Sequence, residues 1–434
     1  MTAVSQSHPP SPSDDGASTP GSMRRRSHSG RDRAIDATRG LAIWSMISLH
    51  FAAGTVVAAP THAFPYVDGM SAFVLLSGLV LGIVYQRWVT AHGLTYALRR
   101  LVRRVATLYA CQLFLSLVAV AAAQAIAPRT FRRLAHLPPD ADPATQLEWA
   151  ATLRYLPSGG NILALYLLLM AAALAVVPLL AKRLWPVVLG GSLALFAATM
   201  IWPTGPHGTS ALTITAFPGG PPVQNWAAWQ VLFIPAIVIG WRWDAWRVPE
   251  RIDRRLGLII AITIVVGLTV DDALMSDDLR PHLVLLIDKV DLGPARALLS
   301  FLVVTCVYGT FRAALRWMRR DLLRPLVVTG ARSLDSYVVQ AVCLLAIPIL
   351  VVDRPWKPSL AIVIALAVFA ACWVWAELRT RWGVDKLHRA PMLLAASVKN
   401  AWAARQARNG ERETSERQRE GGEQAGQEAS RLHR

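Results

Sequence analysis

The sequence predicts an all-α fold, a polytopic transmembrane helix bundle of about ten helices flanked by disordered cytoplasmic tails. Of the 434 residues, 54% are hydrophobic and 17% are charged, whereas a typical soluble domain has about 25% charged residues. Apolar runs of roughly 17–25 residues recur along the chain, which is the length a helix needs to cross a bilayer. Arginines gather between these runs, as the positive-inside rule predicts for cytoplasmic loops.

Composition divides the chain into three regions. Residues 1–30 are rich in Ser, Pro, Gly and charged residues, and such a segment buries too little apolar surface to fold. We therefore predict a disordered N-terminal tail. Residues 31–380 contain the apolar runs and form the predicted transmembrane domain. Residues 381–434 form a basic and polar C-terminal tail.

Each apolar run is predicted to be a helix, because a spanning segment must satisfy its backbone hydrogen bonds internally. The seventh run is short and rich in Ile and Val. In chain order, the predicted helices cover residues 34–59, 67–87, 102–127, 161–181, 185–202, 226–242, 256–271, 295–312, 332–352 and 358–379.

The loops between these helices alternate in charge. Basic residues concentrate after the second, fourth, sixth and eighth helices, whereas residues 60–66 and 203–225 contain no Lys or Arg. Residues 128–160 depart from this alternation with four arginines, but a long loop weighs less in setting orientation. With an even number of helices, the pattern predicts a cell-membrane protein with both termini in the cytoplasm.

The charges also indicate which partners to expect. The formal net charge is +17, but a nucleic-acid binder would need a folded basic domain, so no nucleic acid is expected. Basic clusters beside apolar runs predict contact with anionic lipids. No spacing typical of a metal site occurs, and the four cysteines are interpreted as buried apolar side chains. These are Cys111, Cys306, Cys343 and Cys372.

The first helix carries three ionisable side chains on one stripe. Asp36 and Arg39 are three residues apart and therefore neighbours on a helix. His50 follows Arg39 by eleven residues, about three turns and about 16 Å along the axis. Arg39 can hold a phosphate or carboxylate at the cytoplasmic mouth, and a deep His50 can act as a general base. The alternative is a boundary ion pair and a histidine that bonds a neighbouring helix.

Further candidates lie at the second and third helices. Asp68 begins the second helix, either as a catalytic residue or as an interfacial charge. Ser77 precedes a glycine and is a candidate oxyanion donor, unless the pair serves close helix packing. Arg100 and Arg103 share one side of the third helix. They form either a positive-inside cluster or a site for an anionic cofactor such as coenzyme A.

Two polar residues in later helices are candidates for substrate binding, together with Asp36. Gln230 lies just inside the sixth helix, although the neighbouring Trp226 and Trp229 are typical of an interfacial aromatic belt. Asp335 opens the ninth helix, where it either meets substrate or complements the helix N-terminus.

Several of the segments that carry these residues resemble the OpgC proteins and, more broadly, membrane acyltransferase family three. The wider family has an Arg, ten residues and then a His in its first helix, as Arg39 and His50 do. The ordered similarities cover about residues 31–340. After the first helix they are Asp68 with Ala-Phe-Val-Leu-Leu-Ser77-Gly78, Asn161-Ile-Leu-Ala-Leu-Tyr166, Trp229-Gln230-Val-Leu-Phe233, Asp288-Lys289 with Leu292-Gly-Pro294, and Gly330-Ala-Arg-Ser-Leu334.

The resemblance implies succinyl transfer from an acyl-CoA donor to hydroxyls of an extracytoplasmic glycan, with no permanently bound cofactor. In this interpretation His50 is the base or acyl carrier, supported by Asp68 and Ser77, while Arg39, Arg100 and Arg103 bind the donor. Two positions depart from the family pattern, since Leu49 replaces an Asp and Ala331 stands where the family has a His nearby. A similar first helix occurs in heparan-glucosaminide acetyltransferase-like proteins, so acetyl is an alternative to succinyl.

The competing hypothesis is a multi-pass transporter or flippase without acyl-transfer chemistry. Its sequence signature would be inverted repeats or broken helices at matching positions in two halves. Neither pattern stands out in this chain.

Overall fold

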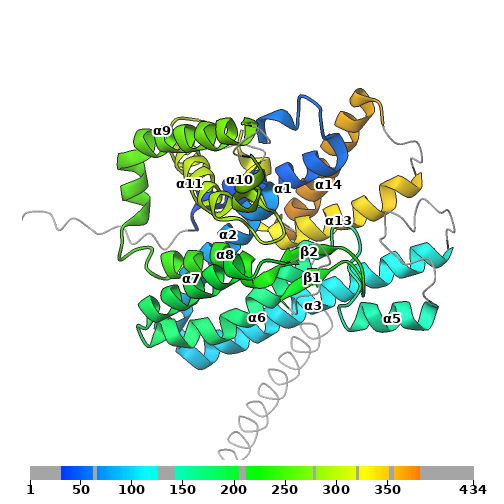
Figure 1. Cartoon of the computed structure of the whole chain (residues 1–434), viewed down its shortest axis with the longest axis horizontal. Helices are drawn as coiled ribbons and strands as arrows, with labels where there is room; N and C mark the ends of the chain where they lie inside the picture. The colour runs from blue at the N-terminus through cyan, green and yellow to red at the C-terminus, as the bar shows by residue number, and fades with distance from the viewer. Residues whose placement is uncertain are drawn as a thin grey trace, which may run out of the picture. The chain divides into compact units, whose positions relative to one another are not determined.

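The computed structural model describes residues 31–61, 66–125, 142–204, 212–276, 280–318, 322–350 and 356–381 (Figure 1). Contacts divide the chain into two units, Met1–Asp32 and Arg33–Arg434. Within the described ranges, the second unit contains thirteen α-helices and one short hairpin. The predicted all-α class is therefore confirmed.

Every predicted helical segment coincides with a helix in the structure. These ten helices are α1 (Arg33–Ala52), α2 (Gly69–His92), α3 (Leu94–Ala125), α6 (Asn161–Ala181), α7 (Trp185–Ile201), α8 (Trp226–Trp241), α9 (Val248–Met275), α11 (Pro294–Trp317), α13 (Ser333–Leu350) and α14 (Pro358–Arg381). The elements without a sequence prediction are η1 (Ala59–Thr61), α5 (Pro143–Ala151), α10 (Arg280–Ile287), α12 (Arg324–Ala331), and the paired strands β1 (Thr213–Thr215) and β2 (Pro222–Asn225).

The apolar helices identify a membrane protein. Among the described residues, α2, α3, α6, α9, α11 and α14 are each long and apolar enough to cross a bilayer, and α12 with α13 would make a seventh span. α7 and α8 are apolar but shorter, and α1 carries Arg33, Asp36 and Arg39 among its 20 residues. By length and composition alone, the structure thus supports fewer crossings than the ten helices predicted.

The first helix is shorter than predicted. It ends at Ala52, because Gly54 adopts a positive φ of 77° that other residues rarely adopt. The backbone N–H of Thr55 then bonds the carbonyl of Ala52 at 3.1 Å. His50 consequently lies in the last turn of α1 instead of within a longer helix, and its depth in the membrane stays a prediction.

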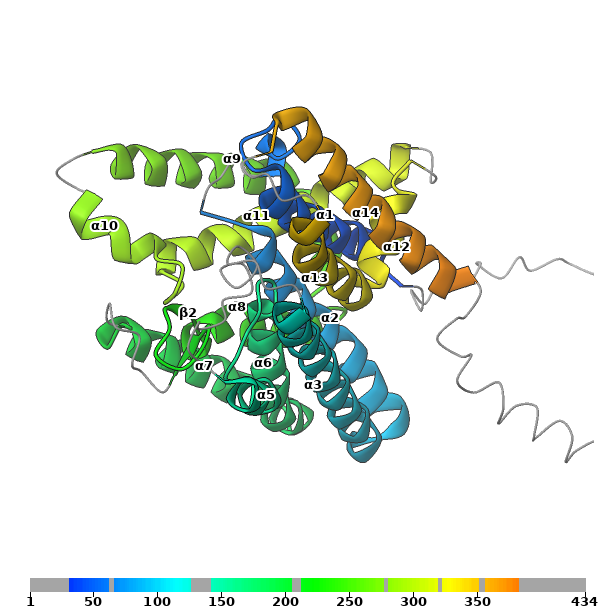
Figure 2. The same ribbon diagram turned by 90° about the vertical axis from the view of Figure 1, so that its right-hand side faces the viewer.

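A sharp bend separates α12 from α13, where the sequence predicts one helix beginning at residue 332. The two axes differ by 92°, with Arg332 between the helices. α12 packs against α1 (Figure 2), and a side chain at Gly330 would overlap the carbonyl oxygen of Asp36. The same holds for Gly40 against the backbone of Leu326. Small residues therefore let the two backbones approach closely, which holds the bend beside α1.

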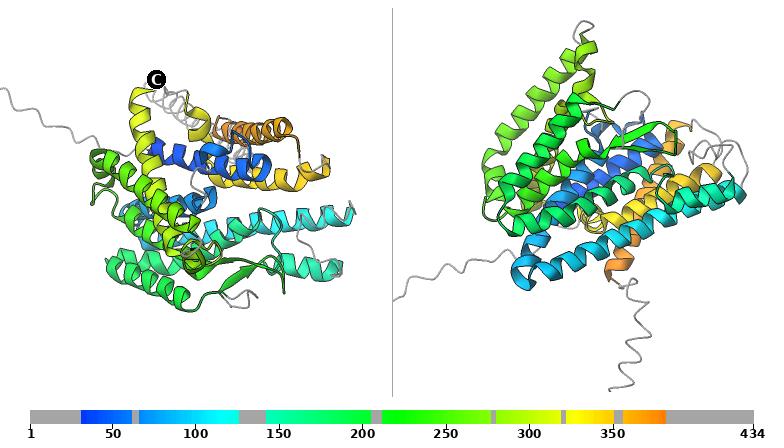
Figure 3. Two further views of the ribbon diagram at one scale, coloured as in Figure 1. Left: turned by 45° about the horizontal axis from the view of Figure 1, so that its top comes forward. Right: turned by 60° about the horizontal axis from the view of Figure 1, so that its bottom comes forward.

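α2 lies along α8 and also contacts α1, α3, α6 and α11 (Figure 3). Gly78 sits against the backbone of Phe233 with no room for a Cβ. Rings from four helices meet beside this contact. The centroid of Phe73 lies 5.6 Å from that of Tyr166 and 5.8 Å from that of Tyr337. This aromatic core joins α2, α6, α8 and α13.

Charged residues join the polar ends of the later helices. Asp253 of α9 pairs with Arg312 and Arg316 of α11, and Glu377 of α14 pairs with Arg324 of α12 at 2.5 Å. The polar start of α9 continues as helix into the apolar run, so this helix reaches 28 residues, well beyond the short segment predicted.

Candidate functional site

A cavity of about 490 Å³ lies where α1, α2, α3, α6, α14 and the α12–α13 bend meet. Five charged side chains line it, and they come from four separate parts of the chain. They are Arg39, Arg104, Arg332, Asp335 and Arg379. Four guanidinium groups against one carboxylate give the lining a net positive charge, which suits an anionic ligand. We call this space the arginine cavity.

Two polar contacts organise its wall. Arg39 donates from Nη2 to the hydroxyl oxygen of Ser333 at 2.5 Å, which ties α1 to the first residue of α13. Nη1 of Arg379 lies 2.5 Å from Oδ1 of Asp335, which ties α14 to the same turn. The bend between α12 and α13 thus presents Arg332, Ser333 and Asp335 to the cavity from one short segment.

Ser77 contributes a polar group to the same cavity. Its side chain is 3% exposed, and its hydroxyl oxygen has no hydrogen-bond partner within the described part of the chain. A buried hydroxyl without a partner costs free energy unless a ligand or water meets it. Ser77 can therefore donate a hydrogen bond to a molecule in the arginine cavity.

The structure brings three sequence-predicted residues together here, since Arg39, Ser77 and Asp335 all line the arginine cavity. Arg100 and Arg103 are exposed on α3 and are not among the lining residues. The lining arginine of α3 is Arg104, which the sequence analysis did not select. It shares a helix face with Thr107 and Cys111, both in the lining, and this i, i+3, i+7 pattern is the signal that marks it.

Arg332 and Arg379 also line the cavity, and the sequence analysis did not select either of them. Arg332 belongs to the Gly-Ala-Arg-Ser-Leu segment quoted for its family resemblance, but only the structure reveals that it lines the same cavity as Arg39. Arg379 lies in the last turn of α14, where a basic residue is expected for reasons unrelated to a site.

Two other predicted residues lie elsewhere. Asp36 is buried in the first turn of α1, where its backbone adjoins Gly330. Gln230 donates from Nε2 to the carbonyl of Ser192 at 2.8 Å and accepts from the Ser192 hydroxyl at 2.6 Å. That side chain thus joins α8 to α7. The substrate-binding roles of both residues stay predictions.

His50 is half-buried near the end of α1. It does not belong to the lining of the arginine cavity in the described part of the chain. On an α-helix, the eleven residues that separate it from Arg39 correspond to about 16 Å. Its predicted catalytic role would therefore require a reacting group that reaches along α1.

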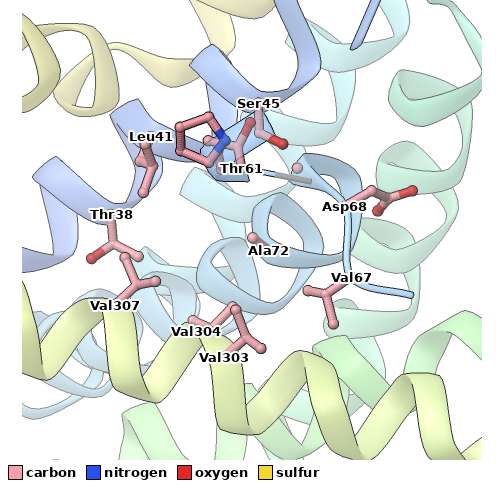
Figure 4. Close-up of a pocket in the computed structure, with 13 residues that line it drawn as sticks. Thr38, Leu41, Ser45, Thr61, Val67, Asp68, Ala72, Val303, Val304 and Val307 are labelled. Carbon is pink, nitrogen blue, oxygen red and sulfur yellow. The ribbon is translucent and has the colours of Figure 1, made fainter. Parts of the chain in front are cut away.

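Asp68 borders a second cavity, of about 120 Å³, on another face of α1 (Figure 4). Val303, Val304 and Val307 of α11 line the opposite side, and the Asp68 carboxylate points away from these valines. Asp68 caps α2 by accepting hydrogen bonds from the backbone N–H and the hydroxyl of Ser71, both at 2.9 Å.

Neighbouring groups keep the Asp68 carboxyl ionised. The Lys289 ammonium lies 3.0 Å from Oδ2 of Asp68. Burial by itself raises the pKa of the Asp68 carboxyl, but Lys289 and the two Ser71 donors outweigh it, so the pKa lies below its ordinary value. Asp68 is therefore an ionised acceptor at neutral pH.

The segment that carries Lys289 is fixed by the start of α8. Trp229 donates from its indole nitrogen to the carbonyls of Lys289 and Val290, at 3.1 and 3.2 Å. Asn225 donates from Nδ2 to Asp291 at 2.9 Å. Three of the segments quoted for the resemblance thus assemble into one polar cluster around Asp68, Lys289 and Asp291.

A sequence model of the family described as OpgC protein matches residues 31–383, which is more than half of the 434 residues. The match contains both the arginine cavity and the cluster around Asp68. No curated protein and no solved structure matches the chain.

Proposed function

The chain belongs to the OpgC family, and from this membership we propose that it is a membrane-bound O-acyltransferase. The proposed donor is cytoplasmic acyl-CoA, carrying a succinyl or acetyl group. The proposed acceptor is a hydroxyl of an extracytoplasmic glycan.

The arginine cavity is the observation that carries this proposal. Coenzyme A bears phosphate groups, and planar guanidinium groups bind phosphate with two hydrogen bonds at once. A volume of about 490 Å³ falls within the usual range for small-molecule sites, about 300–1,000 Å³. Arg104, Arg332 and Arg39 would receive the phosphates or the donor carboxylate. Arg100, exposed one turn from Arg104, would meet the donor outside the cavity.

Ser77 would act on the thioester. Its buried hydroxyl, which has no partner among the described residues, would donate to the carbonyl oxygen of the donor while the thioester lies in the arginine cavity. The flexible arm of coenzyme A would carry the thioester from the arginines along α1 towards His50.

His50 would act as the general base. It would take the proton from the glycan hydroxyl, the oxygen would form a bond to the thioester carbon, and the carbon–sulfur bond would break. The thiolate would then take the proton from the imidazolium. In the covalent alternative, His50 would first receive the acyl group and then pass it to the hydroxyl. Asp68, ionised beside Lys289, would orient the acceptor.

A direct test uses membranes that contain the full chain, a labelled acyl-CoA and a glucan acceptor. We expect His50→Ala to lower transfer by at least about a hundredfold, in line with general acid–base contributions. Leu49→Ala, in the same turn and exposed, is the matched control and should retain transfer. Undiminished transfer by His50→Ala would refute the role of His50.

The proposed orientation places both termini in the cytoplasm. The α2–α3 connection would then face the cytoplasm and the β1–β2 hairpin the outside. In a chain without its native cysteines, Arg99→Cys and Pro218→Cys should react with an impermeant thiol reagent from opposite sides. Reaction of both from one side would contradict this topology.

The bend between α12 and α13 is the observation that favours the competing transporter hypothesis, since transporters often use broken helices. Within the described residues there is one such bent pair, without a counterpart in the other half. Release of free coenzyme A from acyl-CoA by purified protein distinguishes the two, because a transporter would give none.

A further inference from the structure

The hairpin between α2 and α3 carries three aromatic side chains and one arginine that lie close together. The ring centroids of Tyr85 and Trp88 are 4.9 Å apart, and those of Trp88 and Tyr96 are 6.3 Å apart. The Arg100 guanidinium lies 5.6 Å from the Trp88 ring centroid and 5.2 Å from that of Tyr96. Arg100 also donates to the Tyr96 hydroxyl at 2.7 Å. We call these four residues the aromatic cluster.

The aromatic cluster adjoins the arginine cavity. Tyr85 and Trp88 are themselves among the lining residues, together with Arg104. Arg100 precedes Arg104 by four residues and therefore lies on the same face of α3. A single residue, Gly93 with φ of 84°, connects α2 to α3, so the two helices hold the rings and the arginines in one fixed arrangement.

Aromatic residues at a membrane interface are common, but two features set this cluster apart. Trp88 contacts the interior of a cavity rich in arginine instead of only the outer surface. In addition, Arg100 is exposed although its guanidinium lies beside the Trp88 and Tyr96 rings. Nucleobases stack on aromatic rings and on guanidinium planes.

The arginine cavity and the aromatic cluster together provide the two parts of a nucleotide site, one for phosphates and one for a base. The arginine cavity suits phosphates, and the adjacent cluster offers a flat surface at its edge. We propose that the aromatic cluster binds the purine base of the nucleotide donor, with the base stacked on Arg100 and supported by Trp88 and Tyr96. This inference rests on the proposed function, because it assigns part of the donor of that reaction.

The first experiment measures binding without catalysis. Full-length protein in detergent is titrated with ADP and, separately, with pyrophosphate, which lacks the base. Base stacking is typically worth enough to change affinity on the order of tenfold. We therefore expect Trp88→Ala and Arg100→Gln to weaken ADP binding on the order of tenfold and Trp88→Phe to weaken it less. Pyrophosphate binding to Trp88→Ala should be unchanged.

Arg99→Gln is the matched control, since Arg99 is an exposed arginine beside the cluster on the same helix. It should bind ADP as the unaltered chain does. Equal loss of ADP and pyrophosphate binding in Trp88→Ala would overturn the proposal, as would equal ADP binding by all variants. Competition by phosphatidylglycerol vesicles but not by adenosine would identify a lipid-headgroup surface instead and would also overturn it.

The second experiment compares two donors in the transfer reaction. Trp88→Ala should raise KM for acyl-CoA on the order of tenfold and leave KM for the same acyl group on pantetheine unchanged. Equal increases for both donors would contradict a base-binding role. Trp88-dependent ADP binding without transfer by the unaltered chain would leave the base site standing and refute the proposed acyltransferase.

Discussion

Arg39 links the first helix to the bend between α12 and α13. Its guanidinium bonds Ser333 and lines the arginine cavity at the same time, which requires several donors held in one plane. The sequence singled out Arg39, Ser77 and Asp335 separately, each by being polar within an apolar helix. Their meeting could not be predicted, because helical periodicity gives the phase of a residue on its own helix and not the neighbour it faces.

Arg39→Lys tests the planar geometry at this position. Lysine keeps the positive charge but cannot bond Ser333 and a phosphate in the same fixed arrangement. We expect KM for acyl-CoA to rise on the order of tenfold, with a small change in thermal stability. Steady-state transfer at varied acyl-CoA measures this. Kinetics equal to those of the unaltered chain would show that only the charge matters.

Asp68 gives the protein a pH-dependent contribution to stability. Its pKa in the folded state is lowered by Lys289 and Ser71, so the stabilisation is complete above the ordinary Asp pKa and is lost as pH falls through the lower, folded value. Asp68→Asn keeps a side-chain oxygen for the cap but loses the ion pair to the half-exposed Lys289, so it should cost roughly 0.5–1 kcal/mol at neutral pH. Its melting temperature should approach that of the unaltered chain as the pH is lowered below the ordinary Asp pKa. A deficit that stays constant with pH would contradict this account.

Helix packing sets the position of the site. α12 can lie against α1 only because Gly40 and Gly330 leave room for backbone contact. The sequence did not reveal the bend, because α12 has only eight residues and lies before the predicted start of the ninth helix at residue 332. It also placed the start of α3 too late, because Arg99 and Arg100 resemble a loop although they are helical.

Gly330→Ala tests this contact. The added Cβ would overlap the Asp36 carbonyl, so α12 would shift and Arg332 would move away from Arg39. We expect a loss of about 1–3 kcal/mol in stability together with a large loss of transfer.

Gly190→Ala in α7 is the control, since a Cβ there meets open space. It should be neutral or slightly stabilising, because alanine favours helix over glycine. Thermal melting and transfer assays on the same preparations separate the two variants. Equal behaviour of Gly190→Ala and Gly330→Ala would contradict the role of the close contact.

Over the whole molecule, ten predicted helical segments were all found, because apolar length and backbone satisfaction in lipid constrain them strongly. The charge pattern was less informative about the site. Positive-inside clustering places several arginines at one end of α3, and choosing Arg104 over Arg103 needs the rotation of that helix against α2. The short helices α5 and α10 and the β1–β2 hairpin carry no apolar run long enough to cross a bilayer and had no comparable signal.

Two sets of polar residues would bind the two substrates of the proposed reaction, one set the donor and the other the acceptor. The arginine cavity and the aromatic cluster would hold the nucleotide end of acyl-CoA, while Asp68 and Lys289 would face the glycan. His50, near the end of α1, would stand between them in the reaction. The account therefore depends on the donor occupying the arginine cavity.

The most direct measurement is a structure of the full chain bound to a non-reactive thioether analogue of acyl-CoA. We predict phosphates in contact with Arg104 and Arg332, the acyl carbonyl oxygen within hydrogen-bond distance of Ser77, and the base on Arg100. An analogue bound outside the arginine cavity, or no binding at concentrations that support transfer, would contradict the account.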